Sequence, residues 1–147
     1  MTIPRFFRTV VGVVGFLVVG VLAVAQDAGA KKDGHLGTWK LVSTKYGDEK
    51  EFRKRGEDSE RIKHITATHF TWIEVITDSK TIQSGAGGKY TLEGTVYTET
   101  IEYAGQGMEA FVGKPQKFTI KVDGDKLHQS GVLSNGLKIE ENWERMK

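Results

Sequence analysis

"GTWKLVSTKYG", residues 37–47, opens a run in which apolar and polar side chains alternate. Alternation with a period of two is typical of a β-strand with one buried face. A glycine stands two positions before Trp39, and Gly47 ends the run at a turn signal. The stretch therefore predicts the first strand of a β-domain, with Trp39 as its first large core residue.

The segment before this strand has the layout of a secretory leader. Arg5 and Arg8 are followed by an uncharged run over 9–25, which ends in the small-x-small pattern Ala-Val-Ala. The run has 17 residues and three glycines, whereas a membrane-spanning helix needs about 20 apolar residues. We therefore expect a cleaved signal peptide over 1–25, rather than an uncleaved N-terminal anchor. A flexible linker over 26–36 and a single folded domain over 37–147 would follow, in a protein exported to the periplasm or secreted.

Composition restricts the classes of partner. The chain has no cysteine, so neither a lipid-anchored lipoprotein nor a disulfide is expected. The two leader arginines account for the net charge of +2, so the remaining chain is balanced. A balanced domain gives no reason to expect nucleic acid or an acidic surface as partner. We expect no stable membrane anchor after cleavage.

The chain after the leader shows no sustained helical period. Short alternating runs recur instead, and Asp-Gly and Asn-Gly pairs at their junctions are strong hairpin signals. Tight turns leave no room for parallel crossovers, and closing a large antiparallel sheet removes its exposed edges. The sequence thus predicts an all-β fold, a single antiparallel up-and-down β-barrel of about eight to nine strands. A β-sandwich is the alternative. The runs cover 39–46, 61–66, 69–77, 80–84, 89–92, 95–103, 116–122, 126–133 and 137–146.

One segment interrupts this pattern. Residues 47–61 contain 11 charged residues out of 15, and Phe52 is their only large apolar residue. A solvated loop or short helix at the barrel mouth is the favoured interpretation, because charged runs are usually solvated. A mobile lid over a cavity is the alternative.

Several stretches resemble a known group of barrels. "GTWKLVS" (37–43) and "EENWERMK" (140–147) resemble the first and last strands of the calycins, which include lipocalins and fatty-acid-binding proteins. Residues 87–103 and 124–145 resemble the small lipocalin-like domains of exported bacterial proteins, so the resemblance covers 36–147. It implies a lipocalin-like barrel in which Trp39 packs at the closed end and Arg145 lies across its ring. Such an arrangement gains cation–π attraction and covers apolar area.

Alternation also predicts which side chains face the barrel interior. The expected candidates for ligand binding are His64, Trp72, Tyr97, Glu99, Gln129 and Glu141. Tyr103 and Ile62 are expected to face inward as well, and Trp143 is expected in the core with Trp39. A buried carboxylate needs a donor or a proton, and His64, Tyr97 and Arg145 are the candidate internal partners. These polar groups could orient a small ligand, or they could form a structural network that fills a small barrel.

Three functions remain open at this stage. The first is an exported barrel that binds a small hydrophobic or amphipathic molecule. The second is a filled barrel that binds another envelope protein through its surface. The third is an enzyme that uses Glu99 and Glu141 as an acid–base pair, as in glycoside hydrolysis. We expect no enzyme, cofactor or metal, because the sequence contains no zinc-binding histidine motif, nucleophile elbow, phosphate loop or dinucleotide fingerprint.

Overall fold

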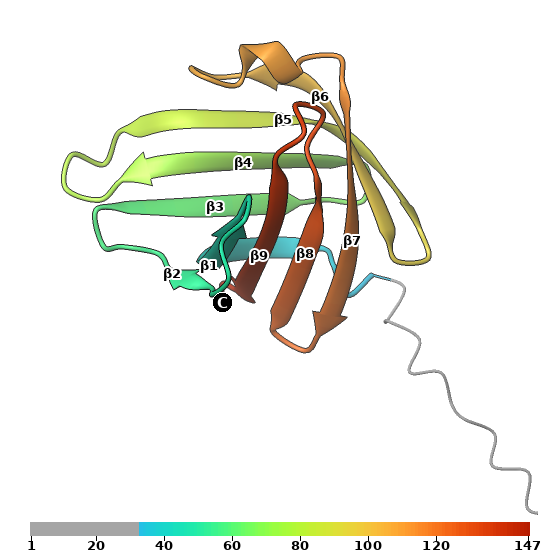
Figure 1. Ribbon diagram of the computed structural model, residues 1–147, viewed down its shortest axis with the longest axis horizontal. Helices are drawn as coiled ribbons and strands as arrows, with labels where there is room; N and C mark the ends of the chain where they lie inside the picture. Colours follow the sequence, from blue (N-terminus) through green and yellow to red (C-terminus); the bar gives the residue numbers. More distant parts are fainter. Residues whose placement is uncertain (1–32) are drawn as a thin grey trace, which may run out of the picture.

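The computed structural model describes residues 33–147 (Figure 1). The expected signal peptide and residues 26–32 of the expected linker lie outside the described residues. No helix in the described part of the chain is long and apolar enough to cross a membrane. The elements are β1 (Gly37–Tyr46), β2 (Arg53–Lys54), β3 (Ser59–Ile65), β4 (His69–Ile76), β5 (Ile82–Glu93), β6 (Val96–Ala104), the 3₁₀-helix η1 (Glu109–Phe111), β7 (Pro115–Asp123), β8 (Lys126–Val132) and β9 (Lys138–Arg145).

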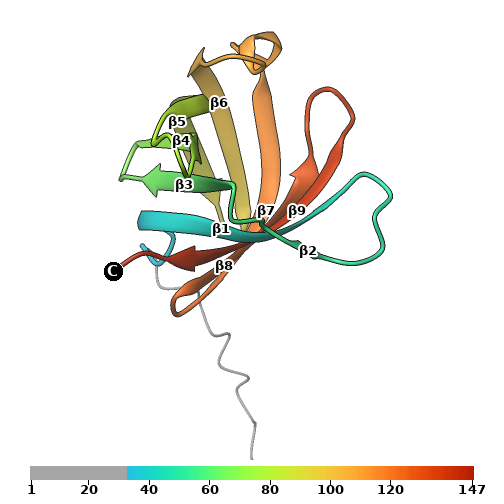
Figure 2. The ribbon, with the colours of Figure 1, turned by 90° about the vertical axis from the view of Figure 1, so that its left-hand side faces the viewer.

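The strands form a closed antiparallel barrel. From β3 to β9 each strand pairs with the next, and β1 pairs with both β3 and β9. Eight strands therefore close on themselves, as Figure 2 shows, and the two-residue β2 adds to β1 beside Ser43 and Thr44. The predicted all-β up-and-down barrel is confirmed, and the sandwich alternative is wrong.

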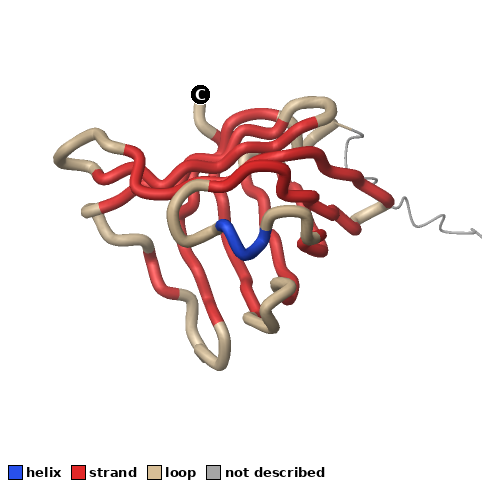
Figure 3. Tube along the Cα trace, turned by 90° about the horizontal axis from the view of Figure 1, so that it is seen from above, coloured by secondary structure: helices blue, strands red, loops and turns tan. Residues whose placement is uncertain are grey.

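Antiparallel connections place successive loops at alternating ends of the barrel. The short turns 66–68, 94–95 and 124–125 lie at one end together with both ends of the described chain. The connections 47–58, 77–81, 105–114 and 133–137 lie at the other end, and Figure 3 shows η1 within the β6–β7 connection from above. We call these the closed end and the open end, because the larger buried cluster, which includes Trp39, lies toward the former.

Trp39, on the first strand, lies at the centre of the packing at the closed end. Its side chain is fully buried, and its Nε1 donates to the His35 carbonyl oxygen at 2.8 Å. The Arg145 guanidinium lies 4.1 Å from the centre of the Trp39 ring, the arrangement that the resemblance implies. Both Arg145 Nη atoms donate to carbonyl oxygens of Gly34 and Leu36 at 2.6 Å. The last strand thereby fastens the start of the domain over the indole.

A glycine-rich stretch makes β5 one strand where the sequence predicts two short runs. A Cβ at Gly88 would overlap the carbonyl oxygen of Thr100, and one at Gly87 would overlap the Tyr103 ring. Small residues therefore let β6 approach closely while β5 continues through the stretch. The β5–β6 register shifts at this point, and Tyr103 is 52% exposed. The expectation that Tyr103 faces inward is wrong, because the bulge reverses the alternation after Ile101.

The charged segment 47–61 divides between two positions: the part around Phe52 packs on the outside of the barrel, whereas Arg55, Ser59 and Arg61 contact the buried Glu74. Its Phe52 ring lies 6.3 Å from the ring of His128, and Lys45 Nζ lies 5.0 Å from the Phe52 centroid. His128 and Lys45 project outward from β8 and β1, because their strand neighbours are the ones that face inward. The segment forms turns, β2 and the start of β3 rather than a helix. Residues 47–54 are mostly exposed, as expected of a solvated connection.

Candidate functional site

A cavity of about 190 Å³ lies in the open half of the barrel. Apolar side chains form most of its wall, and two of them, Met108 and Phe111, come from the β6–β7 connection at the mouth. Its polar groups come from strands on several sides of the barrel. The lining residues are Tyr46, Arg61, Lys63, Trp72, Glu99, Ile101, Met108, Phe111, Gln116, Phe118, Gln129, Leu133, Leu137, Ile139, Glu141 and Trp143.

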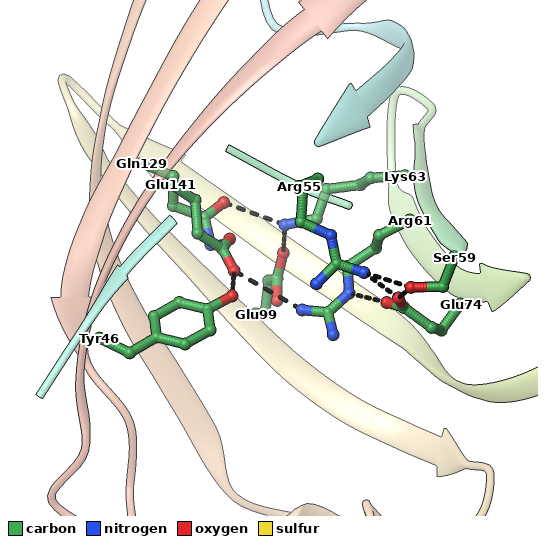
Figure 4. A network of polar contacts seen from close by, with 9 residues as sticks. All are labelled: Tyr46, Arg55, Ser59, Arg61, Lys63, Glu74, Glu99, Gln129 and Glu141. Carbon is green, nitrogen blue, oxygen red and sulfur yellow. Dashed lines mark hydrogen bonds and ion pairs between the residues drawn. The ribbon is translucent and has the colours of Figure 1, made fainter. Parts of the chain in front are cut away.

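Lys63 on β3 forms the most deeply buried polar centre. Its Nζ donates to Glu99 Oε1 and to Gln129 Oε1, both at 2.9 Å, and only 2% of the residue is exposed (Figure 4). The same ammonium lies 4.9 Å from the centre of the Trp143 ring. Burial raises the pKa of the Glu99 carboxyl, and the charge of Lys63 opposes that rise. The lysine thus offsets the cost of placing this carboxylate inside the barrel.

Glu141 on β9 is the second carboxylate. Its Oε1 accepts a 2.6 Å hydrogen bond from the Tyr46 hydroxyl, and its Oε2 lies 3.5 Å from Gln129 Nε2. Arg61 Nη1 approaches Oε1 at 3.7 Å, which is an ion pair without a hydrogen bond. Burial and the neighbouring Glu141 charge raise the pKa of Tyr46. The phenol therefore remains a hydrogen-bond donor.

Glu74 on β4 completes the network and has the most donors. It accepts hydrogen bonds from Arg61 Nε at 2.7 Å, from Ser59 Oγ at 2.6 Å and from Arg55 Nη2. Burial alone would raise its pKa, but the Ser59 hydrogen bond and the two arginines lower it. The Arg61 guanidinium also lies 4.6 Å from the centre of the Trp72 ring. Arg61 therefore joins Glu74 to the Glu141 side of the cavity.

The network as a whole is balanced in formal charge. Three cations, from Arg55, Arg61 and Lys63, face three carboxylates, and each carboxylate has a cation within 4 Å. Buried charges are tolerated when they are paired and hydrogen-bonded. The arrangement can orient a polar group of a small molecule at one wall of an otherwise apolar cavity.

The structure brings four of the six predicted ligand-binding residues to the cavity wall. These are Trp72, Glu99, Gln129 and Glu141. Tyr97 instead lies in the closed-end core, 4.8 Å from the Tyr90 ring between centroids. Its buried hydroxyl has no hydrogen-bond partner among residues 33–147.

His64 lies outside the barrel, so the expectation that it and Ile62 face inward is wrong. His64 Nδ1 contacts the Thr38 hydroxyl at 3.0 Å in an exposed position, and the inward set on β3 is Arg61, Lys63 and Ile65. Alternation along β3 offers two faces, and the prediction chose the one that carries Ile62 and His64. The opposite face of β3 points inward, because the inward carboxylates need cations beside them.

Two of the three predicted carboxylate partners are wrong. His64 and Arg145 make no hydrogen bond to Glu74, Glu99 or Glu141, and Arg145 lies at the closed end. Burial raises the pKa of the Glu99 carboxyl, and the Tyr97 hydroxyl is near enough to oppose that rise. The residues that sequence reasoning missed are Tyr46, Arg55, Ser59, Arg61 and Lys63. One signal was available: the two carboxylates predicted to face inward, Glu99 and Glu141, had only Arg145 and His64 as candidate cationic partners. Within residues 33–147 no group of three or more metal-ligating side chains is assembled.

Comparisons with known proteins agree with this architecture. The structure is similar to a lipocalin-like protein from Bacteroides uniformis ATCC 8492, with a TM-score of 0.58 and 13% identity over 77% of this chain and 99% of that one. It is also similar to an uncharacterized protein from Bacteroides eggerthii DSM 20697, with a TM-score of 0.55 and 13% identity over 76% and 98%. No protein-family model and no curated protein matches the sequence. The protein therefore has a lipocalin-like barrel fold, as its sequence predicts.

Proposed function

We propose that this protein is exported and binds a small hydrophobic or amphipathic molecule in the open half of its barrel. The observation that carries the proposal is the cavity of about 190 Å³, with apolar walls and a charge-balanced polar network at one side. Apolar pockets with few oriented polar groups are typical of small-ligand sites. The leader-like segment over 1–25 supports export.

The volume limits the size of the ligand. An engineered protein cavity of about 150 Å³ binds benzene, and the present cavity of about 190 Å³ is somewhat larger. A single ring with one small substituent therefore fits, whereas a long-chain lipid does not fit within the cavity alone. A cavity of this size also supports a binding function over a filled barrel that acts only through its surface.

The carboxylates support binding rather than catalysis. Glu99 is held by Lys63, and Glu141 is held by Tyr46 and Arg61. Acid–base hydrolysis needs one carboxyl that gives up a proton and another that is free to act on water or substrate. Glu99 is ion-paired with Lys63 at 2.9 Å and is not free to act beside Glu141, so we do not propose an enzyme.

The test is binding of toluene, a neutral single-ring probe, measured by ligand-detected NMR and calorimetry. We expect binding to the domain and loss of binding in Leu133→Trp, because Leu133 lines the cavity and the larger ring would fill it. Val132→Trp is the matched control, because the adjacent Val132 is 53% exposed and lies outside the lining. Absence of toluene binding, or equal loss in both variants, would contradict the proposal. Native mass spectrometry of the exported protein then identifies any molecule that is retained during purification.

A further inference from the structure

Arg61 presents unused hydrogen-bond donors at the cavity wall. Its Nε is bound to Glu74, but its Nη1 lies 3.7 Å from Glu141, beyond hydrogen-bond distance. Its Nη2 makes no hydrogen bond to any residue that the structure describes, and Figure 4 shows it at the free edge of the guanidinium. The side chain is 23% exposed and lines the cavity. A ligand atom that accepts hydrogen bonds can therefore reach this edge.

A weakly used acceptor lies directly beside these donors. Glu141 Oε1 already accepts a hydrogen bond from Tyr46, whereas Oε2 has only the 3.5 Å contact with Gln129. The 3.7 Å separation between Arg61 and Glu141 brings the free donor edge and this carboxylate side by side. A single polar group can accept from Arg61 and donate to Glu141 at once if it carries both a lone pair and a hydrogen. Hydroxyl and primary amide groups meet that requirement.

The charge balance of the network disfavours a net charge on the ligand. The three interior cations are already matched by Glu74, Glu99 and Glu141. An additional carboxylate at Arg61 would lie close to Glu74 and Glu141 without a cation of its own, and burying an unpaired charge is costly. An additional ammonium would likewise lie beside Arg61 without a free carboxylate. A neutral group keeps the network balanced.

We propose that the ligand is a neutral single-ring molecule whose hydroxyl or primary amide bridges Arg61 and Glu141. This inference rests on the proposed function, since it assigns the chemical class of the molecule in the same cavity. The ring would lie against the apolar wall formed by Phe118, Leu133 and Ile139.

The test compares probes of nearly equal size by calorimetry at neutral pH: toluene, benzyl alcohol, benzamide, benzoate and benzylamine. We expect benzyl alcohol or benzamide to bind about tenfold or more tightly than each of the other three, because one good polar contact is worth about that factor. Binding of toluene as tight as that of both neutral polar probes would overturn the inference and leave the proposed function intact. Tighter binding of benzoate or benzylamine would also overturn it. Failure of all five probes would overturn the proposed function as well.

A pair of variants tests the role of Arg61 itself. Arg61→Lys keeps a positive charge near Glu74 but removes the planar edge with its Nη donors. We expect it to lower benzamide affinity about tenfold and to leave toluene affinity unchanged. Arg53→Lys is the matched control, because Arg53 is 70% exposed and pairs with Glu49 outside the cavity. Unchanged benzamide affinity in folded Arg61→Lys would refute the bridging geometry.

Discussion

Removal of Lys63 tests whether the interior network is a balanced ionic unit. Lys63 and Glu99 are joined at 2.9 Å, and their side chains are only 3% and 5% exposed. Breaking a buried pair by removing one partner costs about 3–5 kcal/mol, because the remaining charge is left in a poor solvent. We expect Lys63→Met to lower the free energy of unfolding by that amount, measured by urea denaturation. A domain of this size has about 5–15 kcal/mol in total, so the loss is large.

Replacing Glu99 as well as Lys63 provides the decisive comparison. Replacing both members of a buried pair by apolar residues is often neutral or stabilising. We therefore expect the double variant Lys63→Met/Glu99→Leu to recover to within about 2 kcal/mol of the wild type, on the same principle. Lys89→Met is the control, because the Lys89–Glu102 pair is 65% and 40% exposed and exposed pairs contribute less than about 1 kcal/mol.

The pH dependence of stability provides a second, independent test of the Lys63–Glu99 pair. Burial raises the pKa of Glu99 above its ordinary value of 4.5, and Lys63 opposes this rise. Without Lys63 the pKa rises further, so the folded state binds a proton that the unfolded state has lost. Stability of Lys63→Met should therefore fall more steeply than that of the wild type as pH increases from 4.5 toward the folded-state pKa. The network is not a balanced ionic unit if Lys63→Met is within about 1 kcal/mol of the wild type, or if the double variant is no more stable than Lys63→Met.

Three further predictions address other parts of the fold. Trp39→Ala should cost about 3–5 kcal/mol in thermal or urea unfolding, as large buried aromatic truncations do, and a wild-type unfolding curve would remove Trp39 from the core. Tyr46→Phe removes the 2.6 Å hydrogen bond to Glu141 and should cost about 1.5–3 kcal/mol with an unchanged circular dichroism spectrum; a loss below about 0.5 kcal/mol would contradict the described contact. Because the pKa of Glu74 is lowered from 4.5, its stabilising contribution is complete above that pH and is lost as pH falls through the folded-state value. The stability difference between wild type and Glu74→Gln should therefore shrink on acidification, and a constant difference from neutral pH to below pH 4.5 would contradict the assignment.

The sequence predicts the barrel well because the signals for it are local. Alternation along each run and Asp-Gly or Asn-Gly turns specify antiparallel neighbours one hairpin at a time. The same alternation places Glu99, Gln129 and Glu141 inward, where the structure has them lining the cavity. It fails where the backbone departs from a regular strand, as at the β5–β6 bulge that turns Tyr103 outward.

Strand β3 shows the limit of this reasoning for the site. A period of two leaves two possible faces, and the choice between them depends on what the other strands place inside. Apolar Ile62 favours one face locally, but the barrel places Glu99 across from Lys63 and Glu74 next to Arg61. These partners are 36 and 13 residues away along the chain. No local pattern carries that information.

By itself, therefore, the sequence determined the fold class, the approximate strand positions and the inward carboxylates, because each rests on the alternation and turn chemistry of neighbouring residues. Only the tertiary structure decided which cations enter the barrel, that a cavity of about 190 Å³ remains, and that Arg61 presents free donors beside Glu141. Those properties depend on how eight strands from distant parts of the chain share one interior. The cavity volume and the charge balance of the network depend on all the side chains that face the interior, so they are defined only once the barrel has closed.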